Sequence, residues 1–152
     1  MNRFVLPLSA PQATDADRVG PKAANLALLA RAGLPTPGGF CLTAKAYRHQ
    51  AERLGLSGAL RDYNCADPRV QRKLSVEIRL ALYEQPIASE IAEPLLAVWR
   101  AHRELASGGP GAPWAVRSSA LVEDRVDANF AGQFESFLGI DNDVDFLTAV
   151  RA

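Results

Sequence analysis

A helical spacing of apolar residues fills the middle of this 152-residue chain, and it constrains the fold more than any other feature. In its clearest stretch, apolar side chains recur every three to four positions, at Val70, Leu74, Ile78 and Leu82. This spacing is typical of one face of an α-helix. The central pattern predicts four helices, over residues 44–54, 58–62, 68–83 and 90–105. Residues suited to N-terminal caps precede three of them: Thr43, Ser57 and Ser89.

Short extended segments are expected before this helical centre. Residues 4–8 are interpreted as an edge strand or an extended lead-in, residues 9–18 as an exposed loop, and residues 40–42 as a strand. A helix is predicted over residues 22–32, because Gly20 and Pro21 precede it and Gly33 follows it.

After the Gly- and Pro-rich break at residues 107–111, the pattern changes to that of strands. Residues 114–117 and 135–140 predict two strands that pair like a hairpin. Asn142 or Asp143 is expected to cap a final helix, and the sequence stops within two or three turns of it, which indicates a truncated chain. We therefore expect an α+β fold with a helix-rich centre and a small antiparallel sheet.

Composition and charge exclude several classes of protein. Lysine plus arginine (17) equals aspartate plus glutamate (17), so no net positive field is available for binding nucleic acid. No apolar run approaches the roughly 20 residues of a membrane span, and the N-terminus lacks the pattern of a signal peptide. A cytoplasmic protein is expected. Cys41 and Cys65 lie far apart, without metal-ligand spacing, and are assigned no chemistry.

Lys22 is the first candidate binding residue, because it lies in the first turn of the helix predicted over residues 22–32. Unpaired backbone N–H groups and the helix dipole favour an anion there, and a phosphate would suit the position. The alternative interpretation is a solvated surface lysine.

Arg117 is the second candidate, at the end of a predicted strand and directly before Ser118 and Ser119. Its fork of N–H donors beside two hydroxyl groups suits a phosphate. The alternative is an ion pair with Glu123 or Asp124 that holds the following loop.

The loop before the last strand carries two weaker signals. Gly132 would let backbone N–H groups approach a polyphosphate closely, although a simple turn explains a glycine equally well. The acidic residues Glu123, Asp124 and Asp127 could bind Mg²⁺, but Arg125 lies among them and loop capping is the alternative. No metal ligand is assigned within the chain.

No residue is assigned a catalytic role. Ser118 and Ser119 would act as nucleophiles only beside a base. Neither His49 nor His102 has a sequence context that indicates a triad, so both histidines are interpreted as structural.

Two segments, taken together, indicate a protein family more clearly than the single candidate residues do. They are GPKAANLALLARAGLPTPGGFCLTAKAYR (residues 20–48) and AVRSSALVEDRVDANFAGQFESFLGI (residues 115–140). In this order they resemble the N-terminal ATP-binding, ATP-grasp-like domain shared by phosphoenolpyruvate synthase, pyruvate phosphate dikinase and rifampin phosphotransferases. The resemblance implies that Lys22 and Arg117 contact ATP phosphates. It also implies a glycine-containing loop over the triphosphate, formed by Ala131, Gly132 and Gln133.

The chain departs from the family pattern in two ways. The family usually has two glycines before the lysine, whereas here Gly20 is followed by Pro21, which removes one backbone N–H donor. The second ATP-grasp subdomain, with its Mg²⁺ ligands, and the phosphohistidine domain are expected beyond Ala152. Residues 1–152 are therefore interpreted as a partial ATP-binding domain.

The resemblance implies a kinase-type function for the complete protein. Such enzymes split ATP and pass a phosphoryl group through a phosphohistidine to pyruvate or a similar acceptor. This chain would supply the ATP-binding portion, with ATP and the remaining domains as its partners, and catalysis by the chain alone is not expected because phosphoryl transfer needs metal ions and several cationic groups together. The alternative is a non-catalytic binding or interaction module that retains the fold.

Overall fold

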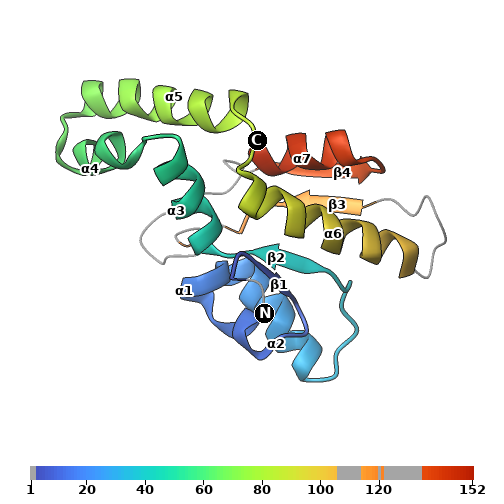
Figure 1. Ribbon diagram of the computed structural model, residues 1–152. Helices are drawn as coiled ribbons and strands as arrows, with labels where there is room; N and C mark the ends of the chain where they lie inside the picture. Colours follow the sequence, from blue (N-terminus) through green and yellow to red (C-terminus); the bar gives the residue numbers. More distant parts are fainter. Residues whose placement is uncertain (1–2, 106–113, 120, 122–134) are drawn as a thin grey trace.

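The computed structural model describes residues 3–105, 114–119, 121 and 135–152 of the chain. Within these residues helices predominate, and the strands form two separate antiparallel sheets of two strands each. Figure 1 shows the long helix α6 (Ser89–Leu105) beside both sheets. The predicted α+β fold, with a helix-rich centre, is confirmed.

The first sheet pairs β1 (Val5–Pro7) with β2 (Phe40–Leu42). The segment between these strands forms the 3-10 helix η1 (Pro11–Thr14), α1 (Ala16–Val19) and α2 (Pro21–Arg31). Both strands and α2 lie where the sequence predicts them.

The exposed loop predicted for residues 9–18 is wrong, because two short helices occupy it. Ala10 and Ala13 are buried, so the segment packs against the protein. The Asp15 carboxylate accepts a hydrogen bond of 3.0 Å from the Asp17 amide and caps α1. Pro11 and Asp15 thus begin helices instead of interrupting them.

Three further helices precede α6 in the central region: α3 (Ala44–Arg53), α4 (Ser57–Cys65) and α5 (Pro68–Glu84). The predicted helices are confirmed, although α4 is longer than the expected residues 58–62. None of the helices in the described part of the chain is long and apolar enough to cross a membrane.

The caps of the central helices differ in detail from the prediction. Thr43 precedes α3, but its hydroxyl group donates to the carbonyl oxygen of Arg3 at 2.9 Å instead of capping the helix. Ser57 and Ser89 are the first residues of their helices rather than the residues before them. Asp67, which the sequence analysis left out, caps α5 by accepting from two backbone N–H groups.

The second sheet pairs β3 (Trp114–Arg117) with β4 (Ser136–Ile140), and α7 (Asp143–Arg151) follows. The predicted antiparallel pair is confirmed. The Asn142 side chain caps α7 by accepting from the Asp145 amide at 2.9 Å.

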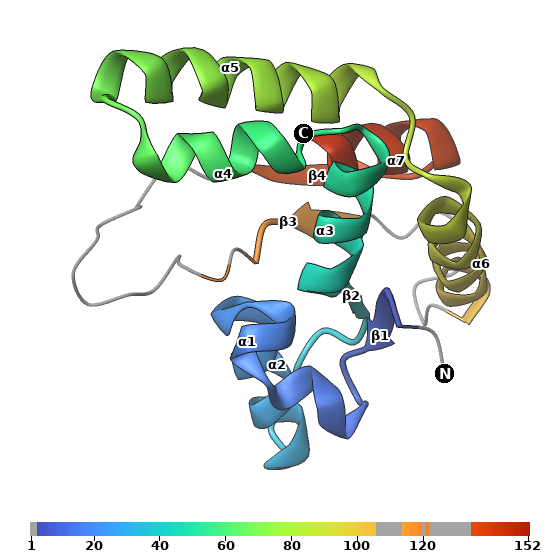
Figure 2. The same ribbon diagram turned by 60° about the vertical axis from the view of Figure 1, so that its left-hand side comes forward.

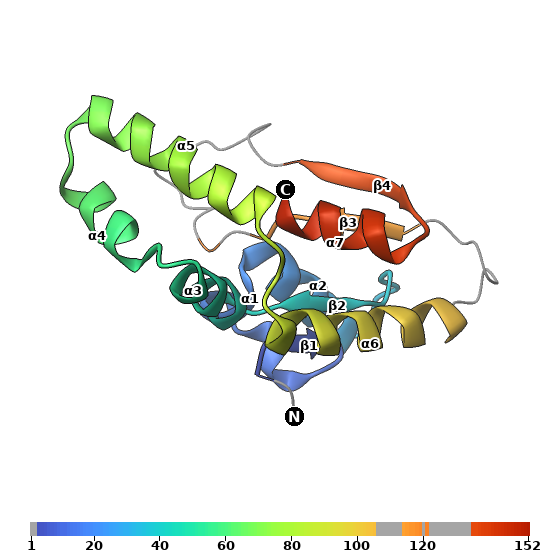
Figure 3. The ribbon, with the colours of Figure 1, turned by 45° about the horizontal axis from the view of Figure 1, so that its top comes forward.

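One buried cluster joins the two sheets through α6. Its members come from both sheets and from the helices α3, α6 and α7, and they are Phe4, Val5, Ala46, Ile91, Leu95, Trp99, Ile140, Phe146 and Ala149. The Trp99 ring, with 1% of its surface exposed, stacks on Phe146 at a centroid distance of 4.3 Å and meets the edge of Trp114 at 5.3 Å. The second sheet and α7 are therefore packed onto α6 (Figure 3).

Asp143 ties α7 to α6 by hydrogen bonds. Its carboxylate accepts from Trp99 Nε1 at 3.0 Å and from two nitrogens of Arg100 at 2.9 and 2.6 Å. The Arg100 guanidinium is the main cause that holds the pKa of Asp143 below its ordinary value of 3.8. The ionised carboxylate therefore stabilises the folded chain.

Removing one buried side chain of α6 should destabilise the fold far more than removing an exposed one. Leu95, with 1% exposed, packs in the central cluster, whereas Leu105 on the same helix is 82% exposed. Leu95→Ala is expected to lower the free energy of unfolding by about 2–5 kcal/mol. Leu105→Ala should change it by less than about 0.5 kcal/mol. Urea denaturation followed by circular dichroism measures both, and equal effects would contradict this placement of the core.

The Asp143 contacts predict a pH dependence of stability. Because the folded-state pKa lies below the ordinary value, the contribution is present above about pH 4 and is lost as the pH falls through the folded-state pKa. Asp143→Asn keeps an acceptor for Trp99 but removes the charge. It should cost about 1 kcal/mol or less at pH 7, since Arg100 is 60% exposed and solvent screens the pair. The difference in unfolding free energy from the wild type should shrink as the pH falls below about 4, and a difference that grows in acid would refute this assignment.

Candidate phosphate-binding site

Lys22 is the second residue of α2 and is half-buried. Gly20 stands at the N-cap with a φ of 82°, a backbone conformation that glycine adopts without strain. Pro21 begins the helix with its fixed φ. This local sequence therefore explains why the helix begins here and why Lys22 lies in its first turn.

Arg117 ends β3 and is exposed. It is paired in register with Ser136 of β4. Trp114 and Val116 point to the core side of the strand, where both pack against the central cluster, so the alternating residue Arg117 lies on the open face.

Ser119 brings into contact the two chain segments that carry the predicted binding residues. The Ser119 hydroxyl oxygen accepts a hydrogen bond of 3.0 Å from the Ala23 amide, across 96 positions of sequence. A Cβ atom built on Gly20 would collide with the Ser119 carbonyl oxygen, so the backbones touch at that point. In Figure 2 the chain leaves β3 above α1 and α2. One neighbour of Lys22 therefore contacts a residue two positions after Arg117.

The backbone at the start of α2 is less open to an anion than the sequence suggested. Pro21 has no N–H group, and the Ala23 N–H already donates to Ser119. The Ala24 N–H donates to the carbonyl oxygen of Gly20. Fewer backbone N–H groups are therefore available to an anion at this end of the helix than in an ordinary first turn.

Part of the predicted site lies outside the described residues. This applies to Ala131, Gly132 and Gln133, which the resemblance places over the triphosphate. It applies equally to the acidic residues Glu123, Asp124 and Asp127, so the ion pair considered for Arg117 is not described either.

Metal-binding and nucleophilic chemistry find little support in the described residues. Over these ranges no three His, Cys, Asp or Glu residues gather in a way that could hold a metal ion. The His102 ring lies against Phe40, and His49 lies against Phe4, with ring centroids 5.2 and 5.0 Å apart. Both histidines are packed among aromatic side chains, as a structural role predicts.

Cys41 is similarly unsuited to reaction. Its thiol donates to the carbonyl oxygen of Leu6 at 3.5 Å, and burial raises its pKa to about 11. It therefore carries no thiolate at neutral pH.

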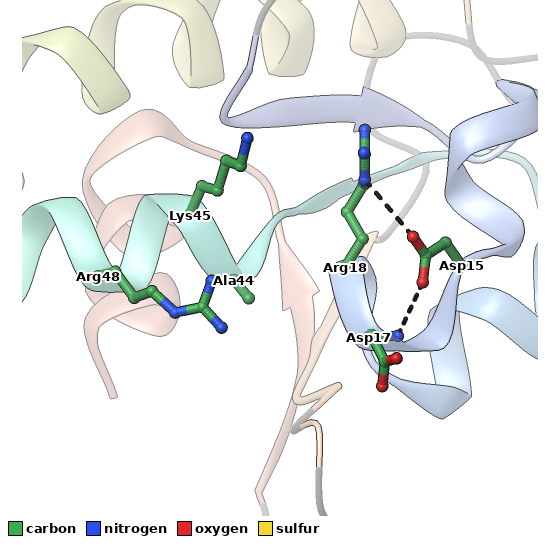
Figure 4. A pocket seen from close by; sticks show the side chains of 6 residues that line it. All are labelled: Asp15, Asp17, Arg18, Ala44, Lys45 and Arg48. Carbon is green, nitrogen blue, oxygen red and sulfur yellow. Dashed lines mark hydrogen bonds and ion pairs between the residues drawn. The ribbon is translucent and has the colours of Figure 1, made fainter.

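A shallow cavity, which the sequence did not predict, lies between α1 and the N-terminal part of α3 (Figure 4). Its lining residues are Asp15, Asp17, Arg18, Ala44, Lys45 and Arg48. The Arg18 guanidinium lies 3.8 Å from the Asp15 carboxylate, so part of its charge is compensated. Because the walls carry charges of both signs on exposed side chains, we assign this cavity no ligand.

Comparison with known proteins relates nearly the whole chain to one family. Residues 16–152 match the family described as pyruvate phosphate dikinase, AMP/ATP-binding domain.

Individual relatives agree with this match. The chain is 35% identical over 146 residues to a probable phosphoenolpyruvate synthase of Staphylothermus marinus, covering 91% of this chain and 17% of the relative. It is 38% identical over 141 residues to phosphoenolpyruvate synthase of Neisseria meningitidis serogroup B, covering 85% and 18%. It is 36% identical over 143 residues to rifampicin phosphotransferase of Streptomyces sviceus, covering 91% and 16%. The chain thus spans less than one fifth of the length of these relatives.

The contact between Gly20 and Ser119 predicts that these two segments tolerate no side chain between them. Gly33 provides a matched control, because it also has a positive φ (77°) but has no atom within 4 Å of an added Cβ. Gly33→Ala should cost about 1–2 kcal/mol of unfolding free energy from backbone strain alone. Gly20→Ala should cost more than about 3 kcal/mol, since strain and a backbone collision add.

Chemical denaturation of the two variants measures this difference directly. Equal destabilisation by Gly20→Ala and Gly33→Ala would show that the segments do not touch in solution.

Proposed function

Because the chain belongs to the family of the pyruvate phosphate dikinase AMP/ATP-binding domain, we propose that Lys22 and Arg117 together bind the phosphates of ATP. In this proposal the chain is the ATP-binding portion of a larger phosphotransferase. The observation that supports it most is the contact of Ser119 with Gly20 and Ala23, which places the end of β3 against the start of α2.

The chemistry of the two cations suits a triphosphate. Arg117 offers a planar fork of donors on an exposed strand end, and Lys22 offers a compact ammonium group at a helix start. Phosphate groups are bound strongly by such charge-assisted hydrogen bonds. Two cations from different elements can hold two different phosphate oxygens, which fixes the orientation of the chain of phosphates.

The loop of residues 131–133 completes the proposed site. The glycine at position 132 would allow backbone N–H groups to approach the phosphates closely. This part rests on the family resemblance of the segment.

Mg²⁺ is expected to accompany ATP, where it would neutralise phosphate charge. The described residues do not gather a set of three potential ligands for it. We propose that its carboxylate ligands, the second ATP-grasp subdomain and the phosphohistidine domain belong to regions that the relatives have and this chain does not cover. We further propose that the complete protein would split ATP and pass a phosphoryl group to pyruvate or a similar acceptor.

Removal of either cation should weaken binding of ATP. Lys22→Ala and Arg117→Ala are each expected to cost about 1.5–3 kcal/mol of binding free energy, the range for a hydrogen bond to a charged group. Lys73→Ala is the matched control, because this exposed lysine lies on α5, where it pairs with Glu77 at 3.7 Å. Calorimetric titration with ATP and Mg²⁺ measures the affinities, after circular dichroism has shown that each variant is folded.

The outcome distinguishes this proposal from a module without nucleotide binding. Loss of affinity in the two site variants but not in Lys73→Ala would support the phosphate site. Folded wild-type protein that binds no ATP would favour the non-catalytic interaction module.

A further inference from the structure

We propose that Ser119 is a positioning residue of the phosphate site, whose hydroxyl group holds Lys22 at the correct distance from Arg117. This inference rests on the proposed function and adds to it a residue that contacts the binding machinery through the protein backbone. In this role the hydroxyl group of Ser119 is essential, and the backbone of the residue alone is not sufficient.

The contacts of Ser119 lie on both sides of Lys22. Its hydroxyl oxygen accepts from the amide of Ala23, the residue directly after Lys22. Its carbonyl oxygen occupies the space where a Cβ of Gly20, two residues before Lys22, would lie. The backbone of Lys22 is thereby held at both ends by one residue of the other segment.

The hydrogen bond between Ala23 and Ser119 takes the role that an N-cap side chain usually has at a helix start. The first N–H groups of a helix have no acceptor within the helix, and a Ser, Thr, Asp or Asn at the N-cap commonly supplies one. Gly20, at the N-cap of α2, has no side chain to do so. Ser119 supplies the acceptor from 96 positions away, so the order of the helix start depends on the position of the segment after β3.

This dependence links the two cations. Arg117 ends β3, whose packing on Trp99 fixes the strand against α6. Ser119 follows Arg117 by two residues, so its bond to Ala23 transmits the position of the strand to the first turn of α2. Binding that needs two cations at a set distance loses affinity when either one shifts by about 1 Å.

The test is a double-mutant cycle with ATP and Mg²⁺ as the titrated ligand. Ser119→Ala should weaken binding about fivefold in the otherwise wild-type chain, because losing the hydrogen bond to Ala23 leaves the first turn of α2 less ordered. In the Lys22→Ala background the same change should weaken binding less than about twofold, since the group being positioned is absent. Ser119→Thr keeps the hydroxyl group and should restore most of the affinity.

A matched control and a structural readout complete the experiment. Ser75→Ala removes an exposed hydroxyl group on α5 that donates to the carbonyl oxygen of Arg72 within the same helix, and it should leave the affinity unchanged. Amide hydrogen exchange at Ala23 should be faster in Ser119→Ala than in the wild type. If Ser119→Ala does not fold, Ser119→Cys takes its place, because its sulfur is only a weak hydrogen-bond acceptor.

The outcomes separate this inference from the proposed function. Equal loss of affinity in the wild-type and Lys22→Ala backgrounds would overturn the positioning role while leaving the phosphate site intact, as would unchanged affinity in Ser119→Ala. Absence of ATP binding by the folded wild-type chain would overturn both.

Discussion

The close approach of Gly20 and Ser119 is the constraint on which the candidate site depends. A backbone carbonyl oxygen occupies the space beside Gly20, so only a residue without a side chain permits the contact. The same residue, Ser119, provides the acceptor that the first turn of α2 lacks. A single contact thus orders the start of a helix and brings together two segments that lie far apart in the sequence.

The rest of the fold positions the two segments that meet at this contact, the start of α2 and the end of β3. On one side, the short helices between β1 and β2 pack small side chains such as Ala13, Ala24 and Ala27 and thereby position α2. On the other side, the aromatic stack on Trp99 and the Asp143 hydrogen bonds hold α7 and the second sheet on α6. Stability and site geometry are therefore coupled, because loosening α6 would also displace the end of β3.

Local patterns predicted most of the elements because the physical causes of those elements are local. The apolar spacing in residues 68–83 predicted α5, and the small and apolar residues at 114–117, after the Gly- and Pro-rich break, predicted β3. The segments at residues 20–48 and 115–140 also predicted the family of the chain, and the match of residues 16–152 to that family confirms it.

The missed features depend on long-range contacts or on competing uses of one residue type. Proline and aspartate occur both in loops and at helix starts, so Pro11 and Asp15 alone do not distinguish the two. The burial of Ala13, which the sequence does not show, is what favours helices here. The unpaired N–H groups expected in the first turn of α2 are partly occupied, because the Ala23 amide donates to Ser119, which follows the distant strand β3. The loop of residues 131–133 lies outside the described part of the chain, and its role stays a prediction.

The measurement that tests the central claim most directly is a nuclear magnetic resonance titration of the ¹⁵N-labelled chain with ATP and Mg²⁺. If the two segments form one phosphate site, the backbone amide signals of residues 22–24 and of residues 117–119 should shift together and fit a single dissociation constant. Shifts confined to one segment, or two segments that titrate with different constants, would contradict a shared site.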